Sequence, residues 1–248
     1  MFNLNLERLN PAAAKRIKPF FEEVSSKYDE NLHSIYVTGT SLTDDFDLKN
    51  SDVNSIFVLK QMDLEFLKLM APLGKKYRKS KVAAPLIMTP AYIERSLDVF
   101  PIEFLNFKLI HAAVFGEDVL KSVQINRMDL RHQCERELKT KLIWLRQGYI
   151  SSMGNMKTLS QELAASISGY VPLFRGILTL LGEEPPIIQS QVITALAKTT
   201  QVNTDAFLNL LKGKQEGIKL SKEELAVIFK DFYAATERLG GIVDEIKN

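Results

Sequence analysis

Residues 39–59 read GTSLTDDFDLKNSDVNSIFVL, and this turn and strand decide how the first half of the chain folds. The turn follows residues 34–38, a β-branched and aromatic run that predicts a buried strand stopped by the first glycine of the stretch. Residues 53–59 predict a second buried strand for the same reason. Side chains two residues apart on a strand point to one face, so Asp52 and Asn54 are expected to lie together where the second strand begins.

The turn and the second strand carry groups suited to a phosphate and a metal ion. A glycine after a strand brings backbone amides close to a ligand, and Thr40 or Ser41 can add a hydroxyl to a phosphate oxygen. Asp52 and the side chain at position 54 can converge on one cation, and such groups hold Mg²⁺ in phosphoryl and nucleotidyl transfer. Asn54 supplies a neutral amide, however, where a second carboxylate would add charge. The stretch therefore fits either an enzyme or a silent relative of one.

Helix and strand signals alternate through the rest of the first half. Asn10 and Pro11 form an N-cap and first-turn pair, which an apolar face at helical spacing follows: Ile17, Phe20, Phe21 and Val24. Residues 63–77 repeat apolar side chains every three or four positions and predict a second helix. Residues 82–89 (VAAPLIMT) and 101–107 (PIEFLNF) predict further strands. This alternation is typical of a sheet covered by helices.

From Asp129 onward the apolar period is helical throughout. Two long stripes come first: Leu130, Cys134, Leu138, Leu142, Leu145 and Tyr149, and then Leu159, Leu163, Ile167, Tyr170, Phe174, Ile177 and Leu181. Ser221 with Glu224 forms a capping box that opens a last helix. The sequence therefore predicts an α+β protein, with an N-terminal mixed β-sheet domain over residues 1–125 and a C-terminal α-helical bundle over residues 126–248.

The composition fits a globular, soluble protein and excludes several classes. The chain has 248 residues, is 46% hydrophobic and 25% charged, and carries a formal charge of +2, a field too weak to favour nucleic acid or an anionic membrane. Cys134 is the only cysteine, which excludes an internal disulfide and a multi-cysteine zinc site. The N-terminus lacks a signal-peptide pattern, and no apolar run approaches about 18 residues. We therefore expect a cytoplasmic protein with no membrane partner.

These features together resemble a known family. A glycine–serine turn on one strand, a carboxylate-x-carboxylate pair opening the next, and a third acidic residue on a later strand resemble polymerase-beta-like nucleotidyltransferases, including the kanamycin and minimal nucleotidyltransferase branches. TGTSLTDDFDLKNSDVNSIFVL looks like their phosphate turn and metal strand. LDVFPIEFLNFK (residues 97–108) looks like the strand with the third carboxylate, and HAAVFGEDVL (residues 111–120) like the segment that often closes the catalytic domain. The resemblance covers the first half of the chain, and the helical bundle matches only in kind.

The resemblance implies a role for each matching residue. Three residues of the turn would hold the triphosphate: Gly39, Thr40 and Ser41. Asp52 and Glu103 would be the catalytic carboxylates and, with Asn54, would hold Mg²⁺ as the cofactor. The chain departs from the family pattern because a threonine separates the glycine from the serine, asparagine replaces the second aspartate, and glutamate stands where the third aspartate is usual. Losing one of three carboxylates is expected to weaken binding of the second ion most.

Competing interpretations exist for the acidic residues. Three of them crowd the loop between the turn and the second strand: Asp44, Asp45 and Asp47. This composition is typical of a solvent-facing connection, although Asp47 could replace the missing carboxylate. Asp52 could instead form an Asx turn at the strand entry, and Glu103 could be an outward-facing residue of an edge strand. The sequence leaves these alternatives open.

Other motifs favour structural explanations. Residues 74–81 (GKKYRKSK) fit the last turn of a helix, where cations complement the helix dipole, so we expect no nucleic-acid partner. Arg127 and His132 have the spacing found in helical ribonuclease domains that often accompany minimal nucleotidyltransferases, but a surface histidine is the simpler explanation. His33 and His111 have no acid or nucleophile at a recognisable spacing and are read as non-catalytic.

The leading prediction is a nucleotidyltransferase-like protein that binds a nucleoside triphosphate with Mg²⁺ and, if active, transfers the nucleotide to a hydroxyl-bearing acceptor. The alternative is a catalytically inactive homologue that acts as a binding or protein-interaction module through the bundle. Asn54 separates the two, because the enzyme needs another carboxylate to take its place. The sequence names neither the acceptor nor the preferred nucleotide, and a homo-oligomer formed through the helical bundle stays open.

Overall fold

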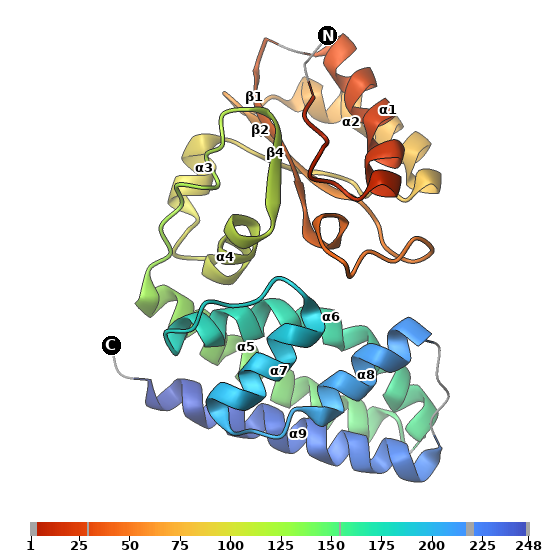
Figure 1. Ribbon diagram of the computed structural model, residues 1–248, viewed down its shortest axis with the longest axis vertical. Helices are drawn as coiled ribbons and strands as arrows, with labels where there is room; N and C mark the ends of the chain where they lie inside the picture. The colour runs from red at the N-terminus through yellow and green to blue at the C-terminus, as the bar shows by residue number, and fades with distance from the viewer. Residues whose placement is uncertain (1–3, 29, 154, 217–220, 247–248) are drawn as a thin grey trace. The chain divides into compact units, whose positions relative to one another are not determined.

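The computed structural model describes residues 4–28, 30–153, 155–216 and 221–246, and the chain divides into two compact units. The first unit contains residues up to 97 and residues 104–124, and the second contains residues 98–103 and the chain from 125 onward. A mixed sheet belongs to the first unit, and a set of long helices belongs to the second (Figure 1). The predicted α+β class is confirmed.

The sheet has four strands in the order β3-β2-β1-β4. They are β1 (Leu32–Thr38), β2 (Asn54–Leu59), β3 (Leu86–Met88) and β4 (His111–Gly116). β1 runs antiparallel to both β2 and β4, while β2 and β3 are parallel, so the sheet is mixed. The strands predicted at residues 34–38 and 53–59 are confirmed, and they pair with each other. The strand predicted at residues 82–89 is confirmed over its end, and Val82 adds an isolated bridge to Val53.

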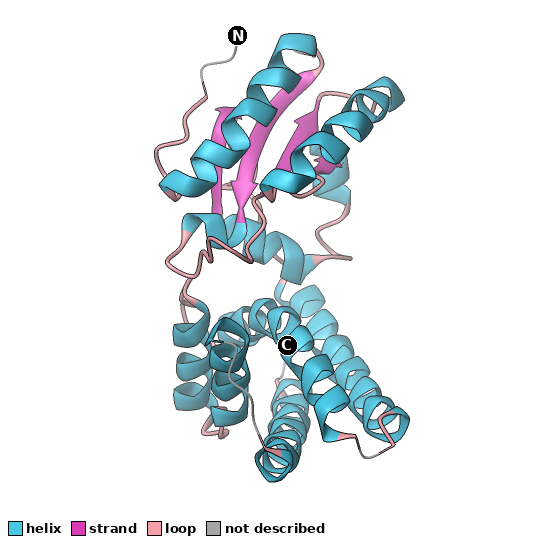
Figure 2. Cartoon of the chain, turned by 90° about the vertical axis from the view of Figure 1, so that its right-hand side faces the viewer, coloured by secondary structure: helices cyan, strands magenta, loops and turns pink. Residues whose placement is uncertain are grey.

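Helices α1 (Pro11–Lys27) and α2 (Leu64–Tyr77) cover one face of this sheet (Figure 2). The Asn10 side chain accepts a hydrogen bond from the Ala12 amide at 2.9 Å and so caps α1 as the sequence predicted. Apolar side chains of both helices pack on alternate residues of the strands: Ile17, Phe20, Phe21, Val24, Phe66, Met70, Leu73, Ile35, Val37, Val53, Phe57, Ala112 and Val114. One face of the sheet is therefore filled by this core.

The strand predicted at residues 101–107, within the longer strand 97–108 of the family resemblance, is wrong. This segment is helix α4 (Pro101–Leu109), which follows the short helix α3 (Pro90–Arg95). The run PIEFLNF is too short for its apolar pattern to separate a strand from a buried helix, and proline at the first position favours a helix. The strand that completes the sheet is β4, immediately after α4.

The second unit contains five long helices among its described residues: α5 (Arg127–Ser151), α6 (Met156–Leu180), α7 (Gln189–Thr200), α8 (Asp205–Glu216) and α9 (Lys222–Glu245). α6 contacts the other four (Figure 1). The capping box of α9 is confirmed, since the Ser221 amide donates to Glu224 Oε2 at 2.8 Å and the Glu224 amide donates to Ser221 Oγ at 3.2 Å. Within its described ranges, the chain beyond residue 129 forms helices and loops without a strand, as predicted.

An aromatic cluster forms the centre of the second unit. The ring centroid of Phe207 lies 4.2 Å from that of Phe232 and 5.0 Å from that of Phe174, and Tyr170 lies 4.9 Å from Phe232. One segment of α6, Glu162–Leu180, is long and apolar enough to cross a membrane by length and composition, and 61% of it is buried. Burial among four neighbouring helices is typical of the core helix of a soluble protein. The cytoplasmic location stays a prediction.

Candidate functional site

A left-handed glycine starts the candidate site at the end of β1. Gly39 has φ +78° and opens a single turn of 3₁₀ helix, η1 (Gly39–Leu42), and its amide donates to the Ile110 carbonyl at 3.3 Å. A Cβ atom at this position would lie 3.7 Å from Asn54 Nδ2. The register agrees, because Thr38 pairs with Asn54 across β1 and β2. The turn and the first side chain of β2 are therefore neighbours.

Ser41 is held inside this turn. Its side chain is buried, and its hydroxyl donates to the Thr38 carbonyl at 3.3 Å. Its own carbonyl accepts from the Asn10 amide at 2.9 Å, which ties the turn to the start of α1. A hydroxyl has a single hydrogen to donate, so a phosphate contact from Ser41 would have to replace the bond to Thr38. Thr40, which is half-buried beside it, is the better placed hydroxyl of the turn.

Asp52 and Asn54 lie at the entry to β2. Both are exposed and flank Val53, which is buried in the core under α1 and α2. Val53 holds the strand entry in place, because its amide donates to the Lys81 carbonyl at 2.8 Å and its carbonyl accepts from the Ala83 amide at 3.1 Å. Since side chains alternate along extended backbone, Asp52 and Asn54 are expected on the face opposite the helices.

The donor set of this site fits one divalent cation better than two. Asp52 offers a carboxylate and Asn54 an amide oxygen, which are ligands that Mg²⁺ accepts. β3, the parallel neighbour of β2, adds no charge, because residues 82–89 contain no acidic residue. In the described parts of the chain, no group of three or more His, Cys, Asp or Glu side chains is arranged to hold a metal ion.

Glu103 lies in a different setting from the one expected. It is on helix α4 rather than on a strand, and its Oε2 accepts a hydrogen bond from Gln133 Nε2 at 2.8 Å. Gln133 is buried and uses its Oε1 to accept from the Ile102 amide at 2.7 Å. This bonding ties the first turn of α4 to α5 within the second unit. The strand that was to present Glu103 to a metal ion does not exist, although its proposed role as a ligand stays a prediction.

The acidic loop before β2 is built by Asx-type hydrogen bonds. Asp47 accepts from the Lys49 amide at 2.7 Å, from the Asn50 amide at 3.2 Å and from Asn50 Nδ2 at 2.7 Å. The Lys49 amide contributes most to holding the pKa of Asp47 below its usual value. Arg16 closes the loop by donating to the Leu48 and Ser51 carbonyls. These bonds support the interpretation of residues 44–50 as a polar connection.

His111 has an acidic partner that the sequence spacing did not reveal. Its Nε2 lies 2.9 Å from Asp118 Oδ1 and its Nδ1 lies 3.1 Å from the Lys108 carbonyl oxygen. His111 also pairs with Thr38 across the sheet, so one row of the sheet runs from His111 through Thr38 to Asn54. Gly116 has φ +77°, and the turn that follows it after β4 places Asp118 beside the histidine. This glycine is the sequence feature that could have indicated the pair.

The basic cluster and the ribonuclease-like spacing have structural explanations. Lys76 Nζ lies 2.6 Å from Glu23 Oε2, and the Tyr77 hydroxyl donates to the same carboxylate at 2.8 Å, so this part of the cluster joins α2 to α1. Together with Lys27, these groups lower the pKa of Glu23 to about 2. His132 is exposed on α5, as a surface histidine would be.

Comparisons with known proteins identify the fold. No family model matches this chain, and no curated protein matches it. Among ten matching chains of solved structures is spectinomycin adenyltransferase AAD(9) from Enterococcus faecialis, solved with ATP and spectinomycin. It is 15% identical, the match covers 92% of this chain and 98% of that chain, and the TM-score is 0.54. The chain therefore has a nucleotidyltransferase-like fold.

Proposed function

We propose that this protein is a nucleotidyltransferase-like nucleotide-binding protein that holds a nucleoside triphosphate with Mg²⁺ at the β1–β2 site, defined as Gly39, Thr40, Asp52 and Asn54. The observation that carries the proposal is the closeness of Gly39 to Asn54. A Cβ atom at position 39 would lie 3.7 Å from Asn54 Nδ2. The turn thus lies beside the Asn54 side chain, and Asp52 stands two residues earlier at the entry to β2. The ATP bound in the adenyltransferase of similar fold supports the choice of ligand.

Each residue of the site has a physical role in this proposal. Gly39 and Thr40 would approach the phosphate oxygens, because the glycine keeps the turn free of a side chain and the threonine adds a hydroxyl. Ser41 positions the turn through its bond to Thr38. Asp52 and Asn54 would hold Mg²⁺, which when bound would align the triphosphate and neutralise charge on it.

Nucleotide transfer to a hydroxyl-bearing acceptor is the finer part of the proposal, and the donor set favours a second candidate. A silent nucleotidyltransferase homologue would bind without transferring and would work as a binding or interaction module. Asn54 brings no charge, the neighbouring strand β3 has no acidic residue, and Glu103 is bonded to Gln133 on another helix. With Asp52, just before β2, as the one carboxylate of the β1–β2 site, binding is better supported than transfer.

Calorimetry with a panel of nucleoside triphosphates, with and without Mg²⁺, tests binding. Asp52→Asn should remove the Mg²⁺-dependent part of the affinity, whereas Asn54→Asp should increase it by adding charge at the ion. The matched control is Asp44→Asn, an exposed carboxylate of the adjoining loop, which should leave affinity unchanged. Equal affinities in the wild type and the Asp52→Asn variant would contradict the proposed site.

Pyrophosphate release with a panel of hydroxyl-bearing acceptors separates transfer from silent binding. Release that depends on Asp52 would establish a transferase and overturn the silent alternative. Release that is absent in the wild type, and stays absent in Asn54→Asp despite tighter Mg²⁺-dependent binding, would support the silent homologue. The binding proposal is tested separately, because its readout is heat of binding rather than turnover.

A further inference from the structure

A groove of about 400 Å³ lies between α5 and α6 in the second unit. We name it the α5–α6 groove; it has Lys141, Gly169 and Tyr170 at one end and Gly148 and Glu162 at the other. Its volume lies within the range of roughly 300–1,000 Å³ that is typical of small-molecule sites. Its lining is mostly apolar, with a charged side chain at each end.

The Lys141 end presents a cation that lies over an aromatic ring. Lys141 Nζ is 4.5 Å from the centroid of the Tyr170 ring. A Cβ atom on Gly169 would lie 3.4 Å from the same nitrogen, so the glycine leaves room for the ammonium. Burial lowers the pKa of Lys141, with the nearby charge of Glu137 acting in the opposite direction. No carboxylate among the described residues forms an ion pair with it, so a bound anion would compensate this half-buried charge.

The Glu162 end presents an anion in the same way. A Cβ atom on Gly148 would lie 3.0 Å from Glu162 Oε2, which is shorter than an ordinary van der Waals contact. This glycine therefore leaves space for the charged side chain that packs against it. Within the described part of the chain, Glu162 has no ion-pair partner. Lys141 and Gly148 are seven residues apart on α5, which corresponds to about 10 Å at roughly 1.5 Å per residue. The groove thus has opposite charges at its two ends.

Apolar side chains connect these ends. Leu159 and Leu163 are buried at the floor of the groove, and Trp144 stands at its edge with 68% of its surface exposed. A tryptophan ring offers a large apolar contact surface at little cost in conformational entropy. Its position beside a groove is therefore suited to covering the apolar body of a ligand.

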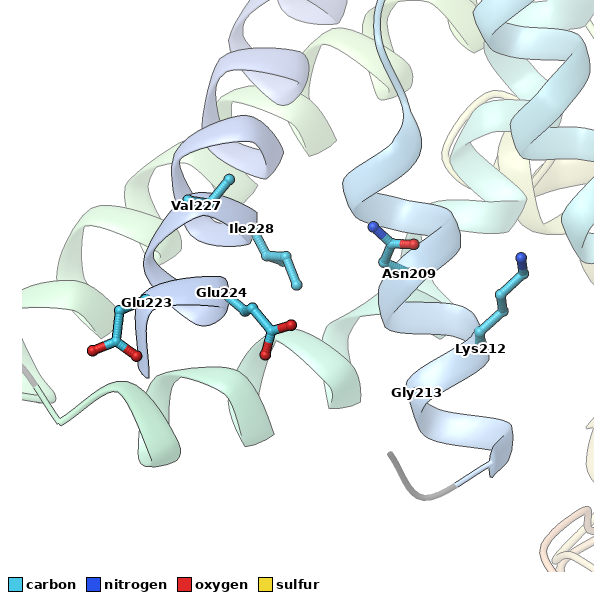
Figure 3. Close-up of a pocket in the computed structure, with 7 residues that line it drawn as sticks. All are labelled: Asn209, Lys212, Gly213, Glu223, Glu224, Val227 and Ile228. Carbon is cyan, nitrogen blue, oxygen red and sulfur yellow. The ribbon is translucent and has the colours of Figure 1, made fainter. Parts of the chain in front are cut away.

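A second hollow in this unit lacks such an arrangement. It lies between α8 and α9, has a volume of about 580 Å³, and is lined by Asn209, Lys212, Glu223 and Glu224 among others (Figure 3). Glu224 already accepts from the Ser221 amide in the capping box, and the side chains of Lys212 and Glu223 point away from each other (Figure 3). Its opposite charges at Lys212 and Glu223 do not converge, so it is the weaker candidate.

We propose that the α5–α6 groove binds an elongated amphiphilic small molecule, with an anionic group at Lys141, a cationic group about 10 Å away at Glu162, and an apolar body against Trp144. The site is independent of the β1–β2 site, because all of its residues belong to the second unit. A ligand with only an anionic or only a cationic group pairs with one of the two charged side chains, Lys141 or Glu162. The groove should therefore bind a zwitterion more tightly than an acid or an amine of equal length.

Calorimetry of the full chain with three probes of equal carbon length tests this. The probes are ω-aminooctanoate, which carries both charges, octanoate, which carries only the negative charge, and octylamine, which carries only the positive charge. The wild type should bind ω-aminooctanoate most tightly. Lys141→Met should weaken ω-aminooctanoate and octanoate by about ten-fold, as expected for one lost charge-assisted contact, and should leave octylamine unchanged. Glu162→Gln should weaken ω-aminooctanoate and octylamine and leave octanoate unchanged.

Lys198→Met on α7 is the matched control, because it removes an exposed lysine elsewhere in the same unit. It should bind all three probes as the wild type does. Circular dichroism checks that each variant is folded, and Trp144→Ala, at an exposed position, should weaken all three probes without affecting stability. The proposal is overturned if ω-aminooctanoate does not saturate the wild type, or if Lys141→Met binds it as tightly as Lys198→Met does.

Discussion

At Gly116, the last residue of β4, the backbone has φ +77°, and a Cβ atom there would lie 2.1 Å from the His33 carbonyl oxygen. The neighbouring backbone of His33 and Ser34 leaves no room for that atom. The same glycine starts the turn that carries Asp118 to His111. This one position therefore fixes both the edge of the sheet and the histidine–aspartate pair.

Gly116→Ala should destabilise the protein by more than about 2 kcal/mol, because left-handed strain adds to a steric overlap with backbone. Urea denaturation measures this change in the free energy of unfolding. The matched control is Gly74→Ala in α2, where a Cβ atom would meet nothing within 4 Å and alanine should add up to about 1 kcal/mol of helix propensity. Similar stabilities for the two variants would show that the turn after β4 relaxes freely.

At the scale of elements, Glu23 links α1 to α2. Its carboxylate forms ion pairs with Lys27 and Lys76 and accepts a hydrogen bond from the Tyr77 hydroxyl. Its pKa is lowered from 4.5 to about 2, with Lys76 as the largest cause. A carboxyl group whose pKa is depressed by folding stabilises the fold above its unfolded pKa and loses that contribution as the pH falls toward the folded value. The link between these helices should therefore weaken between about pH 4.5 and pH 2.

Glu23→Gln should lower the thermal midpoint at neutral pH, because the amide replaces the ionised partner of Lys76. The difference from the wild type should shrink as the pH falls from 4.5 to 2. Glu22→Gln, on the same helix, provides the control: the Glu22 carboxylate lies 3.8 Å from Lys18 Nζ in a more exposed pair, so its loss should have little effect. A midpoint difference that does not change with pH would contradict the assigned linkage.

The contact between α5 and α6 depends on a glycine. A Cβ atom on Gly176 would lie 2.9 Å from Cys134 Sγ and 3.4 Å from Leu130 Cδ1. Gly176→Ala should therefore destabilise the protein by about 1 kcal/mol net, because overpacking of roughly 1–3 kcal/mol exceeds the gain in helix propensity.

Cys134→Ala tests the cause of that loss, since it removes the sulfur that the new methyl group would meet. The double variant should be more stable than the sum of the two single changes predicts, as measured in a double-mutant cycle. Gly240→Ala on α9, where a Cβ atom would meet nothing within 4 Å, should be neutral or stabilising. Strict additivity of the first two substitutions would contradict the close contact.

Sequence patterns predicted the elements well where they were long or capped. The helix at residues 63–77 follows from its apolar spacing of three and four, and the strands at residues 34–38 and 53–59 follow from runs rich in β-branched and aromatic residues. The segment at residues 101–107 failed because seven mainly apolar residues satisfy both a strand and a helix, and the sheet took the following segment instead. Tertiary pairing decided between them.

At the scale of the whole molecule, the candidate site was predicted only in part. The alternation of side chains along extended backbone predicts Asp52 and Asn54 on one face. The burial of Ser41 and the pairing of His111 with Asp118 depend on contacts between segments, which local sequence does not encode. The structural match to the adenyltransferase nevertheless includes residues of both units, since it covers 92% of the chain.

A crystal structure with a nonhydrolysable triphosphate and Mn²⁺ tests the central claim most directly, because the anomalous signal of manganese locates the ion without reference to activity. The account predicts an ion bound to an Asp52 carboxylate oxygen and the Asn54 amide oxygen, with phosphate oxygens beside Gly39 and Thr40. An ion or a triphosphate bound elsewhere, with Asp52 and Asn54 left in solvent, would contradict it.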